Sequence, residues 1–222
     1  MMEIRISSQL KDLVPDFKVG VILYDHIEVG ESPQMIRGRL QTFQESLFFD
    51  LEDKHVTDIQ GIAEWRGIFK QVGTDPNRYR PSVEAIYRRI QKRNFLNSIH
   101  SAADLNNFFS MQYEIPIGIY DTDKMNGKIE IRVGQPSDKY MGINGREISM
   151  KDKILTGDET GAFGSPYVDS ERTAVTTKTK NAIQIVYLKP SLPNESSEKL
   201  ISSLGAMFTQ VHGGTAEPFL VL

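Results

Sequence analysis

Cysteine is absent from the 222 residues of this chain. Its absence excludes disulfide bonds, thiolate zinc sites and a cysteine nucleophile. The chain also lacks a GxSxG elbow, a Walker loop and a GxGxxG turn, the commonest signatures of serine hydrolases, NTPases and dinucleotide-binding enzymes. An enzyme with less common signatures is still compatible with the sequence.

Long apolar runs are missing as well. No segment approaches the length of a membrane-spanning helix. The start of the chain carries Glu3 and Arg5 where a signal peptide would have an apolar core. We therefore expect a cytoplasmic protein with no membrane partner.

Positive charge is not in excess, since the formal net charge is −3 at pH 7. This balance argues against binding nucleic acid by bulk electrostatics, and we expect no DNA partner. A local basic face on an acidic body is compatible with the same balance.

The four histidines are too scattered to predict a metal site. His26, His55, His100 and His212 show no HExxH or other ligand spacing. We expect a surface or capping role for each of them, and the sequence predicts neither a metal nor another cofactor.

The overall composition is that of a folded protein. Hydrophobic residues are 39% and charged residues 25% of the chain, far from the composition of disordered segments. The length allows a real hydrophobic core, in one large domain or in a domain with a small extension. We expect residues 1–222 to form a single domain. Helical and strand patterns do not alternate regularly, which predicts an α+β fold rather than a wound parallel sheet.

Residue patterns predict the main elements. The continuous apolar run from Phe17 to Tyr24 predicts a central strand buried on both sides. The alternation of Ile129, Ile131 and Val133 predicts a strand with one buried face. Other strands are expected at 3–6, 117–120, 173–177 and 182–188, and helices at 7–14, 35–49, 56–69, 82–93, 101–115 and 194–212.

Glycine is concentrated between residues 155 and 166. Gly157, Gly161 and Gly164 lie there, and glycine allows the backbone to come close to a ligand. This composition predicts an exposed loop that contributes to a binding site.

Residues 80–121 hold the densest set of specific signals. Ser82 is placed to cap one helix, and Ser101-x-x-Asp104 resembles a capping box at the start of the next. Asn194 is expected to cap the last helix in the same way. Six basic residues lie between 78 and 93 against one acidic residue. They are Arg78, Arg80, Arg88, Arg89, Lys92 and Arg93.

The basic helix has two interpretations. Arginine pairs with phosphate oxygens through two hydrogen bonds, and a helix start offers free backbone N–H groups. Arg80, Arg88 and Arg89 are therefore candidate phosphate-binding residues. A solvated helix face accounts for the same charges equally well.

Asn106 and Asn107 stand in the middle of an apolar helix, although asparagine is a poor helix former. One of them is expected to reach the core and hold the neighbouring strand by hydrogen bonds. The alternative is that it lines a pocket.

Four segments carry a resemblance to a known family. They are RPSVEAIYRRI from residue 80, AADLNNFFSMQYEIPIGIYD from residue 102, KIEIRV from residue 128 and TAVTTKTKNAIQIVYL from residue 173. In order and spacing they resemble the B3/B4 domain of the bacterial phenylalanyl-tRNA synthetase beta subunit. They resemble still more the free-standing proteins built from that domain alone. The resemblance covers most of the chain and is strongest over residues 65–188.

The resemblance implies an α+β domain in which β-sheets pack with helices around a cleft. In the synthetase this cleft is the editing site, where a wrongly attached amino acid is hydrolysed from tRNA. An asparagine facing that site falls on Asn107. The synthetase's histidine falls on Gly118, which would enlarge the pocket, and a site glutamate falls on Ile185 or close by. One polar group is kept and two are replaced.

Two functions are therefore expected from the sequence. In the first, the chain binds aminoacyl-tRNA or its aminoacyl end, with Asn106, Asn107 and Gly118 at the substrate, and hydrolyses mischarged species as a deacylase. In the second, the fold is kept without the editing chemistry, and the chain is a binding module for RNA or for a small amino-acid-like ligand.

Overall fold

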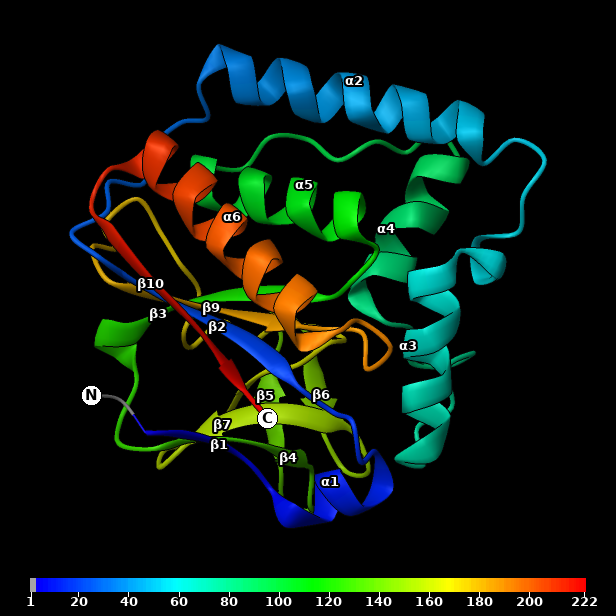
Figure 1. The fold of residues 1–222 in the computed structure, drawn as a ribbon, viewed down its shortest axis with the longest axis vertical. Helices are drawn as coiled ribbons and strands as arrows, with labels where there is room; N and C mark the ends of the chain where they lie inside the picture. Colours follow the sequence, from blue (N-terminus) through cyan, green and yellow to red (C-terminus); the bar gives the residue numbers. More distant parts are fainter. Residues whose placement is uncertain (1–2) are drawn as a thin grey trace.

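The computed structural model describes residues 3–222. Helices cover one face of a four-stranded sheet, and a second four-stranded sheet lies against the other face (Figure 1). The predicted α+β class is confirmed by these separate, mainly antiparallel sheets and helical layers. Met1 and Met2, part of the chain start that was expected to lack a signal-peptide core, lie outside the described residues.

The first sheet has the strand order β10-β2-β9-β3, with every neighbouring pair antiparallel. The predicted central position of the early apolar strand is confirmed, because β2 lies between β10 and β9. All residues of β9 are buried, as expected for a strand covered on both faces. The strand bounds are β2 Val19–Asp25, β3 Ile117–Asp121, β9 Ala182–Tyr187 and β10 Thr215–Val221.

The second sheet has the order β1-β4-β7-β8, and β5 and β6 form a separate hairpin. The predicted alternation in β4 is confirmed, since Ile129, Ile131 and Val133 are buried. A hydrogen bond of 2.7 Å between the hydroxyls of Thr156 on β7 and Tyr187 on β9 joins the two sheets. The bounds are β1 Ile4–Ile6, β4 Ile129–Val133, β5 Lys139–Met141, β6 Glu147–Ser149, β7 Ile154–Asp158 and β8 Gly161–Gly164.

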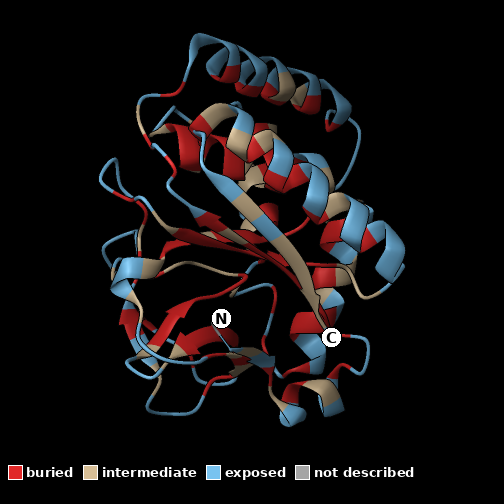
Figure 2. Cartoon of the chain, turned by 60° about the vertical axis from the view of Figure 1, so that its left-hand side comes forward, coloured by how far each residue is buried: buried red, intermediate tan, exposed pale blue. Residues whose placement is uncertain are grey.

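Helices α2, α3, α4 and α6 bury one side and expose the other to solvent, whereas α5 is buried almost all round (Figure 2). In Figure 1, α5 and α6 lie on the first sheet, α2 lies outside α5, and α3 and α4 stand beside the layers. The bounds are α1 Ser8–Leu13, α2 Gln34–Asp50, α3 Gln60–Gln71, α4 Ser82–Gln91, α5 Ser101–Tyr113 and α6 Asn194–His212. Short 3-10 turns are η1 Val56–Asp58 and η2 Thr122–Lys124. Within residues 3–222 no helix is both long and apolar enough to cross a membrane.

The prediction of an exposed loop over residues 155–166 is wrong. These residues form most of β7 and all of β8, and they are largely buried. Gly164 serves close packing instead, since a Cβ built on it would lie 2.3 Å from the Tyr120 hydroxyl oxygen, and Gly161 has a positive φ of 133°. The strand predicted over 173–177 is also wrong, since only a single bridge from Tyr120 to Ala174 forms there. The strand β10 was not predicted at all.

Three predicted helix caps are displaced by one residue. Ser82, Ser101 and Asn194 are the first residues of their helices, and the capping positions belong to Pro81, His100 and Pro193. At α1 the capping position is occupied by Ser7, whose Oγ accepts a hydrogen bond from the Leu10 backbone N–H.

Ser101 has a tertiary role in place of the capping role. Its hydroxyl accepts a hydrogen bond from the Gly30 backbone N–H and lies 2.8 Å from Nε2 of His212. His212 is buried, so the expected surface or capping role is wrong for this histidine. Ser101 therefore forms hydrogen bonds to distant segments in place of the local capping bond that was predicted.

Candidate functional site

A cavity of about 730 Å³ lies between α4, α5, β3 and the loop over residues 165–170. One stripe of each helix faces it. On α4 the stripe is Ser82, Ala85, Ile86 and Arg89, and on α5 it is Ala103, Asn106, Asn107 and Ser110. Both follow the spacing i, i+3, i+4, i+7, which places side chains on one helical face.

The two asparagines of α5 have different surroundings. Asn106 is buried, and its Nδ2 donates to the Ile117 carbonyl on β3 while its Oδ1 accepts from Nε2 of Gln184. The interpretation that one asparagine holds the neighbouring strand is therefore confirmed for Asn106. Asn107 is half-buried and lines the cavity. Its amide is available to a ligand, because no side-chain hydrogen bond within residues 3–222 includes it.

His100 reaches the cavity from the start of α5. Its Nδ1 accepts a hydrogen bond from the Ala103 backbone N–H, so the neutral ring carries its proton on Nε2. Burial lowers the pKa of His100, against a smaller opposing effect of the Val175 backbone. The ring is therefore neutral at pH 7. The expected capping role is confirmed for this histidine, but its place in the cavity wall was not predicted.

Buried polar contacts hold the segment that leads into α5. The carboxylate of Asp104 accepts hydrogen bonds from the hydroxyls of Ser32 and Ser98, and its Oδ1 accepts one from the Ile99 backbone N–H at 2.9 Å. Because Ile99 and His100 line the cavity, this network fixes one side of the opening.

Asp169 contributes a carboxylate that sequence reasoning missed. Its Oδ1 accepts hydrogen bonds from the Tyr120 hydroxyl at 2.6 Å and from the Ser165 backbone N–H at 3.3 Å. Burial raises the pKa of Asp169 to about 6, and these hydrogen bonds oppose the shift. The contact with Tyr120 joins residues far apart in the sequence, and no local pattern in the chain signals it.

The three candidate phosphate-binding arginines have different partners. Glu84 is fully buried, and its carboxylate pairs with Arg66 at 2.9 Å, with Arg88 at 2.8 Å and more distantly with Arg80 at 3.8 Å. Arg89 is exposed and lines the cavity, and none of the ion pairs formed within residues 3–222 includes it. The structure therefore brings Arg89 to the cavity and places Arg80 and Arg88 at a buried carboxylate.

No group of three or more histidine, aspartate or glutamate side chains in the described part of the chain is arranged to hold a metal ion. The polar groups of the cavity wall include amides, an imidazole, a carboxyl group, a guanidinium and several hydroxyls. They suit the binding of a polar organic ligand by hydrogen bonds and charge.

Comparison with known proteins places this arrangement in a family. The family model of the B3/4 domain matches residues 64–202, which include both helix stripes, β3 and the 165–170 loop. The chain belongs to the B3/4 domain family. The uncharacterized protein YhzB of Bacillus subtilis is similar over nearly the whole length, with 35% identity covering 96% of this chain and 97% of that protein.

Other B3/4 relatives are much longer proteins. The phenylalanine–tRNA ligase beta subunit of Fusobacterium nucleatum is 25% identical over 47% of this chain, which spans 14% of that subunit. An N-terminal fragment of the phenylalanyl-tRNA synthetase beta subunit from Pyrococcus horikoshii matches with a TM-score of 0.48 and 16% identity, over 97% of this chain and 50% of that one.

In this B3/4 chain, Gly118 and Ile185 face each other as a cross-strand pair of β3 and β9. Ile185 is fully buried. A Cβ on Gly118 would lie 1.9 Å from the Tyr120 hydroxyl oxygen. The expectation that Gly118 enlarges the pocket is wrong, because Tyr120 fills the space beside it. The phenol of Tyr120 therefore occupies the space beside Gly118, and Ile185 presents an aliphatic side chain on the paired strand.

Proposed function

We propose that this chain binds the aminoacyl end of a tRNA in the cavity between α4 and α5. The observation that carries the proposal is the position of the cavity inside the segment that matches the B3/4 family, relatives of which include tRNA ligase subunits. A volume of about 730 Å³ falls in the range of small-molecule sites.

The lining suits the two ends of such a ligand. Arg89 is exposed at the cavity and is suited to a phosphate group of the RNA backbone. Apolar side chains offer a surface for the amino-acid side chain. They include Ile86, Ile117, Ile119, Val168 and Val175.

Hydrolysis of the bound ester is the activity to test. Ester hydrolysis needs a positioned water and donors for the developing oxyanion. Asn107 and the neutral ring of His100 line the cavity and are the donors that we propose for that role.

The test measures binding of charged and uncharged tRNA, and loss of the ester from mischarged and correctly charged tRNA. We expect Arg89→Ala to weaken tRNA binding and to make the binding less dependent on salt. Arg88→Ala breaks the ion pair with Glu84, so it should affect the stability of the protein more than tRNA binding. Absence of salt-sensitive tRNA binding and of accelerated ester loss across a broad panel of tRNAs would contradict the proposal.

Asn106 and Asn107 provide a matched pair of variants. We expect Asn106→Ala to lower the free energy of unfolding by about 2 kcal/mol, because Gln184 and the Ile117 carbonyl lose a buried partner. Asn107→Ala is expected to change stability by less than about 1 kcal/mol and to weaken ligand binding about tenfold. Urea unfolding and titration with charged tRNA separate the two effects. Equal effects of both variants on stability would show that Asn107 is only structural.

The second candidate is a module that binds a small amino-acid-like ligand and does no chemistry. The pair of Gly118 and Ile185, which offers no titratable side chain, and the net charge of −3 favour it. In that case such a ligand raises the melting temperature while tRNA does not, because a ligand that binds only the native state stabilises it.

A further inference from the structure

Asp169 is the carboxylate of the cavity wall, and one of its two oxygen atoms is hydrogen-bonded to the protein. Oδ1 accepts both hydrogen bonds that the side chain forms within residues 3–222, from Tyr120 and Ser165. Oδ2 has no protein partner there, and it is not among the buried polar atoms that lack one. Since Asp169 is half-buried and lines the cavity, Oδ2 is open to a ligand.

The surroundings of Asp169 lack a compensating cation. The negative charge of Asp169 instead helps to raise the pKa of three phenols, those of Tyr120 on β3, Tyr140 on β5 and Tyr187 on β9. None of the ion pairs in the described part of the chain includes Asp169. A carboxylate that is removed from water without a counter-charge is costly, and a positively charged ligand group would reduce that cost.

We propose that Asp169 recognises the ammonium group of the bound ligand through Oδ2. This assignment rests on the proposed function, in which the ligand is an aminoacyl ester. Arg89 is the guanidinium of the same cavity, so the ligand's two charges have separate partners: the ammonium group at Asp169 and a phosphate at Arg89. The site therefore selects esters of amino acids over esters of hydroxy acids.

This role of Asp169 predicts that the affinity for the ligand depends on pH. Burial raises the pKa of Asp169 to about 6, so the carboxylate is available to a cation only above that pH. The α-amino group of a ligand loses its charge near pH 8. Burial lowers the pKa of His100, the imidazole of the same cavity, and so favours its uncharged form. Binding is strongest between about pH 6 and pH 8.

The test compares two probes on the full chain: a non-hydrolysable aminoacyl-adenosine 3′-amide with an apolar side chain, and its desamino counterpart. We expect the desamino probe to bind wild-type protein about 10- to 100-fold more weakly, the range of a hydrogen bond to a charged group. Asp169→Asn keeps an Oδ1 acceptor for Tyr120. It weakens binding of the amino probe by a similar factor, removes the rise in affinity across pH 6 and leaves the desamino probe unchanged.

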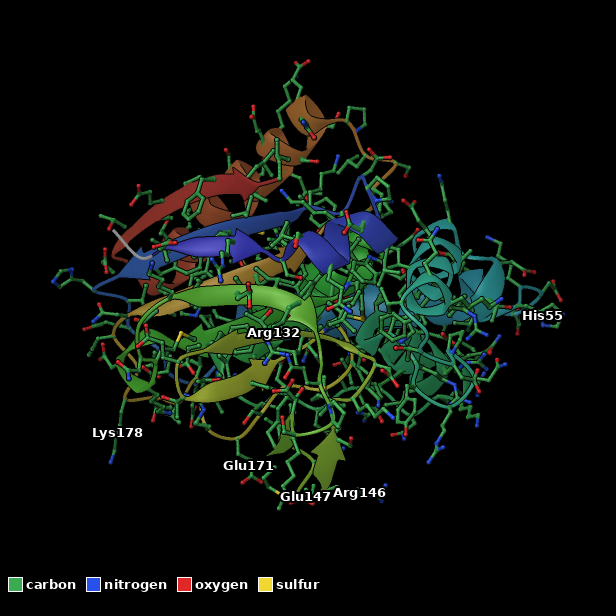
Figure 3. The ribbon with its side chains drawn as sticks, turned by 90° about the horizontal axis from the view of Figure 1, so that it is seen from below. His55, Arg132, Arg146, Glu147, Glu171 and Lys178 are labelled. Atoms are coloured by element: carbon green, nitrogen blue, oxygen red, sulfur yellow. The ribbon has the colours of Figure 1, made fainter. Side chains whose placement is uncertain are left out.

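A matched control is Glu171→Gln, which removes one negative charge two residues along the chain. Glu171 is exposed at the edge of the molecule (Figure 3) and does not line the cavity, so both probes should bind this variant as they bind wild type. A melting temperature measured for each variant shows whether it is folded. If Asp169→Asn does not fold, the comparison of the two probes on wild-type protein across pH 5–8 still decides the assignment.

The outcomes separate this assignment from the proposed function. If both probes bind wild type equally, or Asp169→Asn weakens both alike, the aminoacyl site stands and the role of Asp169 is refuted. If neither nucleoside probe binds, the proposed function fails. Amino-acid methyl esters and their hydroxy-acid counterparts then test Asp169 without the nucleoside. Equal behaviour of those esters, including absence of binding by both, overturns the assignment.

Discussion

At the residue scale, the cavity brings together side chains whose neighbours in sequence do other work. Asn106 and Asn107 both line the cavity, but only Asn106 also ties α5 to β3 and β9. Sequence reasoning identified the pair because two amides in an apolar helix are unusual. It could not find Asp169, because the residue's importance comes from its contact with Tyr120, 49 positions away in sequence.

The raised pKa of Asp169 predicts a pH-dependent stability. An unfolded aspartate ionises near pH 4, whereas the folded group does so at about 6. The folded protein therefore binds more protons between these values, and its stability falls as pH rises through this interval. We expect Asp169→Asn to raise the free energy of unfolding by about 2 kcal/mol at pH 7.5 and to leave it almost unchanged at pH 4.

Urea unfolding at the two pH values measures this difference. Glu171→Gln is the control, because an exposed carboxylate should give no such change between pH 4 and 7.5. A gain for Asp169→Asn that is equal at both pH values would contradict the assigned titration.

At the scale of elements, α4 divides its sides between the cavity, the core and an ion-pair cluster. Ala85 and Arg89 face the cavity, whereas Tyr87 and Ile90 face the core. Glu84 forms ion pairs with one arginine from α3 and one from α4. The sequence shows that α4 is basic. It does not show which of the basic residues face the cavity and which pair with Glu84. A charge count does not reveal that the single acidic residue is buried among the basic ones.

The cluster at Glu84 predicts a large effect of a small substitution. Glu84→Gln leaves the guanidinium of Arg66, which is 14% exposed, without its counter-charge. We expect the free energy of unfolding to fall by about 3 kcal/mol. Glu45→Gln on α2 is the control, since Glu45 is exposed and within residues 3–222 its side chain bonds only to Gln41, and it should cost less than about 0.5 kcal/mol. Chemical denaturation at constant pH compares the two, and similar losses would refute the role of Glu84.

At the scale of the molecule, β10 forms one edge of the first sheet. β10 pairs with β2 along its whole length, and its residues Phe219 and Leu220 pack against the core. Removing residues 215–222 would expose the edge of an apolar strand, which favours aggregation. We expect that truncation to yield insoluble or non-cooperatively unfolding protein.

Size-exclusion chromatography and thermal unfolding measure the effect of this truncation. Removing Leu222 alone is the control, because this residue is 55% exposed and lies beyond β10. A soluble, cooperatively folded chain ending at Gly214 would show that β10 is dispensable.

The sequence by itself determined the elements whose signal is local. The buried β2, the alternating β4, the helices and the α+β class follow from side-chain periodicity, which each segment carries without its neighbours. Tertiary structure alone decided the rest: the β7–β8 hairpin in place of a loop, the serine of α5 bound to His212, and the cavity with Arg89 and Asp169 in its wall. These features depend on contacts between distant segments, and packing and desolvation at such contacts outweigh local propensity.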